Sequence, residues 1–181
     1  MSLFFVYLVS LLSLGETPAP EESLPSEAFS TEQQTEAMTT YYFIRHAEKD
    51  ESNPQDRDPQ LTAAGIERAA KWAEIFKEVD FDLIFSSDYQ RTRKTAETIA
   101  NAQKKQVEIY DPRKLNDEEF QKKTRGKTVL VVGHSNTNPA FANLILEEKR
   151  HKDIDEKESG SLIMVSVAPN GTKASQVLYI N

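Results

Sequence analysis

The stretch Thr128-Val129-Leu130-Val131-Val132-Gly133-His134-Ser135 gives the clearest structural signal in this chain of 181 residues. Residues 129–132 are all branched and apolar, and an uninterrupted run of this kind suits a strand that is buried on both faces. Strands with two buried faces lie at the centre of parallel sheets. The run ends at Gly133-His134-Ser135, so an imidazole and a hydroxyl directly follow the predicted strand.

Strands and helices are predicted to alternate on either side of this stretch. The other strands with a helix after them lie at 41–44, 81–85 and 107–110. The helices lie at 61–79, 88–102, 112–124 and 136–148. Two last strands, 161–167 and 174–180, flank Asn170-Gly171, a dipeptide typical of a hairpin turn. The alternation predicts an α/β fold, a three-layer sandwich in which helices flank a mostly parallel central sheet.

Polar residues follow three of the predicted strands. Arg45-His46 follows the strand at 41–44, Ser86-Ser87 and then Arg91 follow the strand at 81–85, and Gly133-His134-Ser135 follows the strongest strand. The carboxyl ends of parallel strands share one rim, where binding sites form. Two arginines and two histidines would meet there, and the fork of donors on arginine matches phosphate oxygens. The sequence therefore predicts a phosphate-binding pocket.

A neutral imidazole in such a pocket can attack phosphorus. One ring nitrogen must carry the lone pair, and the other needs an acceptor, often a backbone carbonyl, to fix the tautomer. The remaining positive groups stabilise the charge on the phosphoryl oxygens during transfer. This chemistry needs no metal.

The overall composition excludes several classes of function. Acidic residues outnumber basic ones, and the net charge of −7 argues against nucleic-acid binding, which depends on Lys and Arg. The chain has no cysteine, which excludes a thiol nucleophile, a thiolate metal site and a disulfide framework. We expect neither a metal nor another cofactor.

The N-terminal part of the chain differs from the rest. Residues 3–14 are almost wholly apolar, a length that fits the apolar region of an export signal but is too short to span a bilayer. Residues 16–40 are rich in Pro, Ser, Thr and Glu. We expect a signal peptide or membrane anchor at 1–15, a flexible linker at 16–40 and a folded domain at 41–181. The protein would then be exported (periplasmic, extracellular or membrane-associated), and otherwise cytoplasmic.

Four segments, in order, resemble the motifs of the histidine phosphatase superfamily, whose members have the phosphoglycerate-mutase-like fold. They are Phe43-Ile44-Arg45-His46-Ala47-Glu48-Lys49, Leu61-Thr62-Ala63-Ala64-Gly65, Ser86-Ser87-Asp88-Tyr89-Gln90-Arg91-Thr92 and Val131-Val132-Gly133-His134-Ser135-Asn136-Thr137. The absence of a long inserted segment makes the chain similar to the compact, phosphohistidine-phosphatase-type members.

This resemblance implies a role for each matched residue. His46 corresponds to the nucleophile, which forms a phosphohistidine intermediate, and Arg45, Arg91 and His134 correspond to the phosphate pocket. Ser135 is a further candidate for substrate binding. For the general acid, Glu118 and Glu48 are candidates, and a member without a dedicated acid is a third possibility.

The function predicted in this way is a metal-independent phosphatase that acts on a small phosphorylated molecule or a phosphoprotein. Residues 52–60 and 116–125 are expected to form the pocket walls. The acidic run at 153–158 is expected to be a solvated loop, and His151 a surface residue.

Three other functions compete with this one. A serine hydrolase would use Ser135, but Thr137 replaces the second glycine of the nucleophile elbow and only His151 follows the serine. A metal hydrolase would use His46, Glu48 and His134, which lack a paired metal-ligand spacing. A non-catalytic module that binds phosphorylated ligands could be built on the same fold.

Overall fold

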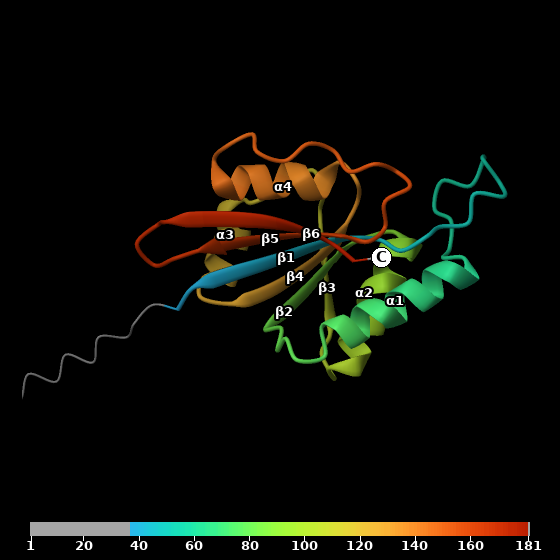
Figure 1. Cartoon of the computed structure of the whole chain (residues 1–181), viewed down its shortest axis with the longest axis horizontal. Helices are drawn as coiled ribbons and strands as arrows, with labels where there is room; N and C mark the ends of the chain where they lie inside the picture. Colours follow the sequence, from blue (N-terminus) through green and yellow to red (C-terminus); the bar gives the residue numbers. More distant parts are fainter. Residues whose placement is uncertain (1–36, 181) are drawn as a thin grey trace, which may run out of the picture. The chain divides into compact units, whose positions relative to one another are not determined.

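The computed structural model describes residues 37–180, and the predicted signal or anchor at 1–15 lies outside them, so it stays a prediction. The elements follow one another as β1 (Thr39–Arg45), α1 (Ala63–Ile75), β2 (Leu83–Ser87), α2 (Gln90–Ala102), β3 (Val107–Tyr110), α3 (Glu118–Thr124), β4 (Thr128–Gly133), α4 (Thr137–Leu146), β5 (Ser161–Val167) and β6 (Lys173–Tyr179) (Figure 1). Within this described part, no helix is both long and apolar enough to cross a membrane.

The strands form one six-stranded sheet in the order β3-β2-β4-β1-β5-β6. The first four of these are parallel to one another, and β5 runs antiparallel to both β1 and β6. The predicted mostly parallel sheet is confirmed. As its sequence predicts, β4 lies inside the parallel part, between β2 and β1.

Helices cover both faces of the sheet, with α1 and α2 on one side and α3 and α4 on the other (Figure 1). The side chains of β4 alternate between the two resulting cores. Val129 and Val131 pack in the core with Phe120 of α3 and Phe141 of α4. The intervening Leu130 and Val132 pack in the core that holds Trp72 of α1. Each β4 side chain therefore enters a dry layer, which explains the uninterrupted apolar run.

Several helices are shorter than the sequence predicts. Helix α2 begins at Gln90 and not at 88 as predicted, with Tyr89 at the N-cap position, and the Asp88 carboxylate pairs with Arg93 at 2.5 Å. Helix α3 begins only at Glu118, capped by the Asp117 side chain, because the preceding residues form turns. At the other end of the chain, β6 begins at Lys173 and pairs antiparallel with β5. This pairing confirms the predicted hairpin.

The register of β1 and β4 brings two candidate site residues, His46 and His134, to neighbouring strand ends. Arg45 pairs with Gly133, and the backbone N–H of His46 then donates to the Gly133 carbonyl at 3.0 Å. Position 133 requires glycine for a steric reason, because an added Cβ would lie 2.1 Å from Oδ1 of Asn138. The amide of Asn138 donates to the Ile44 carbonyl at 2.8 Å, which ties the start of α4 to β1.

Candidate active site

His46 lies directly after β1 and is only 3% exposed. Its Nδ1 lies 2.8 Å from the carbonyl oxygen of Ala47. A carbonyl can only accept, so Nδ1 carries the proton and Nε2 carries the lone pair. The backbone of the next residue therefore holds His46 in the tautomer that a nucleophile requires.

The surroundings of His46 keep it neutral. Burial lowers the pKa of His46 to about 3, and the positive charges of Arg45 and Arg91 act in the same direction. An imidazole that is neutral at pH 7 has a free lone pair on Nε2. The ring is thus available for attack without a separate base.

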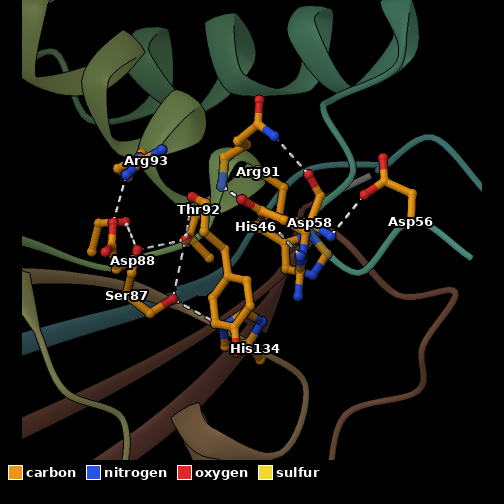
Figure 2. A network of polar contacts seen from close by, with 12 residues as sticks. His46, Asp56, Asp58, Ser87, Asp88, Arg91, Thr92, Arg93 and His134 are labelled. Atoms are coloured by element: carbon orange, nitrogen blue, oxygen red, sulfur yellow. Dashed lines mark hydrogen bonds and ion pairs between the residues drawn. The ribbon is translucent and has the colours of Figure 1, made fainter.

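His134 follows β4, and a hydrogen-bond network orients it (Figure 2). Its Nε2 lies 2.9 Å from the Ser87 hydroxyl, and Ser87 in turn donates to the Thr92 hydroxyl at 3.0 Å. Thr92 donates to the Ser87 carbonyl, so the Ser87 oxygen is left to accept from Nε2–H of His134. Burial lowers the pKa of His134 to about 4, with further lowering by the two arginines.

Arg45 and Arg91 supply two largely buried cations. The Arg45 side chain is 4% exposed and that of Arg91 is 12% exposed. Burial also lowers the pKa of Arg91, and its guanidinium stacks over the Tyr89 ring at 4.5 Å from the ring centroid. Nη1 of Arg91 lies 3.7 Å from the Asp58 carboxylate.

Both guanidinium groups have N–H donors that nothing accepts. Nε of Arg45, and Nε and Nη1 of Arg91, are buried and have no hydrogen-bond partner among the described residues. Buried donors are normally paired, so unpaired charged donors are what an anion site leaves open. The chemistry of these groups fits a phosphoryl ligand.

These residues open onto a pocket of about 610 Å³. It is lined by His46, Lys49, Tyr89, Arg91, Pro112, His134, Ser135, Asn136, Thr137, Asp153, Ile154 and Glu156. The sequence-predicted residues Arg91, His46, His134 and Ser135 thus meet at one site. Arg45 does not line the pocket itself but donates to the carboxylate of Glu156, which does.

The predicted pocket walls, residues 52–60 and 116–125, are wrong, because no residue of either segment lines the pocket. From the 52–60 loop, Asp58 reaches Arg91 and also accepts from the backbone N–H of Gln90 at 2.8 Å. The acidic run at 153–158 is an exposed loop, as predicted, and two of its residues, Asp153 and Glu156, also line the pocket.

Neither candidate for the general acid lines this pocket. The Glu48 carboxylate accepts from Nε of Arg68 at 2.6 Å, on the α1 side of the loop. Glu118 lies in the first turn of α3 and is exposed. The sequence does not predict that Glu156 lines the pocket. The feature that marks this residue in the sequence is its place in the acidic run at 153–158.

The alternatives find little support in the geometry. The Ser135 hydroxyl donates to the Glu156 carboxylate, and no histidine within residues 37–180 hydrogen-bonds to it. His151 instead lies 3.1 Å from the Ser175 hydroxyl. In the described part of the chain, no group of three or more His, Cys, Asp or Glu side chains is placed to hold a metal ion.

The chain matches one known protein family. Residues 41–117 match the family model of the histidine phosphatase superfamily (branch 1). A search of curated proteins found no significant match.

Solved structures with the same fold include several phosphatases. A putative phosphohistidine phosphatase SixA from Nakamurella multipartitia is 22% identical with a TM-score of 0.56, and the match covers 79% of this chain and 96% of that one. The protein histidine phosphatase SixA in complex with tungstate is 14% identical with a TM-score of 0.60, covering 77% and 96%. A phosphoserine phosphatase from Entamoeba histolytica, with 3-phosphoglyceric acid, is 20% identical with a TM-score of 0.60, covering 79% and 98%.

The fold, the matched family and the pocket together define a phosphatase with a phosphoglycerate-mutase-like architecture. Over residues 41–117 the chain matches the model of the histidine phosphatase superfamily, and it shares its fold with compact phosphatases of the SixA type.

Proposed function

We propose that this protein hydrolyses a phosphoryl group through a covalent phosphohistidine on His46, without a metal. The observation that supports this most directly is the state of His46. The ring is buried and neutral, and its Nδ1 is held by the Ala47 carbonyl, so that Nε2 carries the lone pair.

In the first step, Nε2 of His46 attacks phosphorus and the bond to the leaving group breaks, with its electron pair going to the leaving group. The proton on Nδ1 stays in place, and the Ala47 carbonyl stabilises the positive charge of the phosphorylated ring. The unpaired donors of Arg45 and Arg91 bind the phosphoryl oxygens, which carry the charge in the transition state.

In the second step, water attacks phosphorus and the P–N bond breaks. The products are inorganic phosphate and neutral His46. Tyr89 at the pocket rim is 36% exposed, so the pocket is accessible to solvent. Water that reaches the intermediate favours hydrolysis over transfer to a second substrate.

The proposal uses no dedicated carboxylic acid for the leaving group. Glu156, which does line the pocket, is held ionised, since its hydrogen bond with Ser135 lowers its pKa. We therefore expect substrates with good leaving groups to react fastest.

A small phosphorylated molecule and an exposed phosphorylated side chain of a protein both fit this pocket. The similar structures include phosphatases described as acting on phosphohistidine and on phosphoserine.

The proposal is tested by hydrolysis of para-nitrophenyl phosphate, with and without EDTA, by the wild type and by His46→Ala. We expect activity that resists EDTA and is lost in the variant. Activity that EDTA abolishes would overturn the metal-independent mechanism. Phosphate binding without turnover would favour the non-catalytic binding module.

A further inference from the structure

Glu156, in the segment between α4 and β5, contacts two residues of the pocket at once. Its Oε2 accepts from Nη2 of Arg45 at 2.8 Å, and its Oε1 accepts from the Ser135 hydroxyl. Nη1 of Arg45 also donates to the backbone carbonyl of Glu156 and, at 3.4 Å, to that of Glu158. One short segment therefore binds the outer edge of the Arg45 guanidinium.

Burial is very different on the two sides of this ion pair. The Arg45 side chain is 4% exposed, whereas that of Glu156 is 69% exposed. Among the described residues, Glu156 is the one ion-pair partner of Arg45. A buried cation that loses its partner is left uncompensated, so it either moves to solvent or destabilises the site.

The contacts of Glu156 leave one donor of Arg45 unused. Both terminal nitrogens of Arg45 are occupied by the 156–158 segment, whereas Nε is buried and has no partner within residues 37–180. A guanidinium bound along its outer edge keeps a fixed orientation. Donors that are fixed before the substrate arrives need no reorganisation in the transition state.

We propose that Glu156 is a positioning residue, which holds Arg45 and Ser135 in place for the phosphoryl group. This inference rests on the proposed function, because it assigns Arg45 to the phosphate. Glu156 acts through Arg45 and does not touch the reacting atoms. The competing interpretation of the same contact is that the Glu156 carboxylate occupies the phosphate position and must be displaced.

The two interpretations predict opposite effects of Glu156→Ala on phosphate binding. If Glu156 positions Arg45, the dissociation constant of inorganic phosphate, measured by calorimetry, rises about 10-fold, and kcat/KM for para-nitrophenyl phosphate falls roughly 10- to 100-fold, mostly in kcat. Glu156→Gln, whose amide oxygen can still accept from Arg45 or Ser135 but carries no charge, recovers part of the activity. Tighter phosphate binding by Glu156→Ala would overturn the proposal.

Asp155→Asn is the matched control, since it removes one negative charge from the same segment. The Asp155 carboxylate caps the backbone N–H of Lys157 at 2.8 Å and does not line the pocket, and Asn can make the same cap. We expect kcat and the phosphate affinity of this variant to stay within about 2-fold of the wild type. An equal loss in Asp155→Asn and Glu156→Ala would show a general charge effect and overturn the positioning role.

A double-mutant cycle tests whether Glu156 acts through Arg45. In an Arg45→Gln background, Glu156→Ala should have no further effect on phosphate affinity, because the residue that it positions is already gone. Additive losses would contradict the proposal. If Glu156→Ala does not fold, Glu156→Asp, which keeps the charge but has a shorter reach, must lower kcat in the same way.

The failure of this inference and of the proposed function can be told apart. A wild-type protein that does not hydrolyse para-nitrophenyl phosphate contradicts the proposed function. The phosphate titrations of the same variants do not depend on turnover, so they still decide the role of Glu156.

Discussion

The rings of His46 and His134 lie 5.4 Å apart between their centroids, with an angle of 68° between their planes. This relationship follows from backbone geometry, since the two residues extend neighbouring parallel strands and the N–H of His46 donates to the Gly133 carbonyl. The sheet therefore sets the distance between the two imidazole rings without help from a ligand.

Both histidines should stay neutral far below the usual pKa of histidine. The chain has three histidines, so NMR can follow each ring, with assignments from single His→Gln variants. We expect the pKa of His46 to be about 3 and that of His134 about 4, because burial disfavours the charged form. A pKa near 6.5 for His46 would contradict the buried, neutral nucleophile.

The same shifts make the stability depend on pH. The histidines of the unfolded chain titrate near 6.5, so between that pH and the folded pKa values the unfolded state binds more protons than the folded state. Their contribution is fully present above about pH 6.5 and is lost as the pH falls toward 4 and 3. Urea unfolding between pH 7.5 and 4.5 should show this loss, and His46→Gln should reduce it.

Arg91→Lys should damage catalysis far more than Arg93→Lys. Lysine replaces a fixed fork of donors with a point charge, so we expect kcat/KM to fall about 100- to 1000-fold. Arg93 lies in the same helix but pairs with Asp88 at 2.5 Å and is exposed, so its variant should change kcat/KM by less than about 2-fold. Steady-state kinetics on para-nitrophenyl phosphate measure both, and equal effects would contradict the assignment of Arg91.

Ser87→Ala should release the His134 ring. The lost hydrogen bond is worth about 1 kcal/mol, which predicts a fall in kcat of about 5- to 10-fold. NMR of the ring nitrogens should show that His134 no longer favours the Nε2–H tautomer. An unchanged tautomer together with unchanged kcat would mean that Ser87 does not orient this ring.

Much of the fold could be predicted from local sequence. The strand β4 has a continuous apolar run because its side chains enter two dry cores, and the pocket residues are predictable because they follow parallel strands at one rim. The predicted helix boundaries differ more from the structure, as the start of α2 shows. Tyr89 takes the N-cap position of α2 without a side-chain cap, and the Asp88 carboxylate pairs with Arg93, a contact that depends on the finished helix.

The wall at 153–156 could not be predicted in this way. An acidic run has no periodicity that marks a buried face, and only the chain path from α4 to β5 brings Glu156 onto Arg45. The general acid was uncertain for a similar reason. Glu48 is two residues from His46 in the sequence, yet its carboxylate binds Arg68.

The central claim, a covalent intermediate on His46, is tested most directly by trapping it. The protein is mixed with para-nitrophenyl phosphate, quenched within milliseconds in alkali, which preserves phosphohistidine, and analysed by peptide mass spectrometry. The account predicts one phosphoryl group on His46 in the wild type and in Ser87→Ala, and none in His46→Ala. A phosphoryl group on Ser135 or His134, in a protein that turns over, would contradict it.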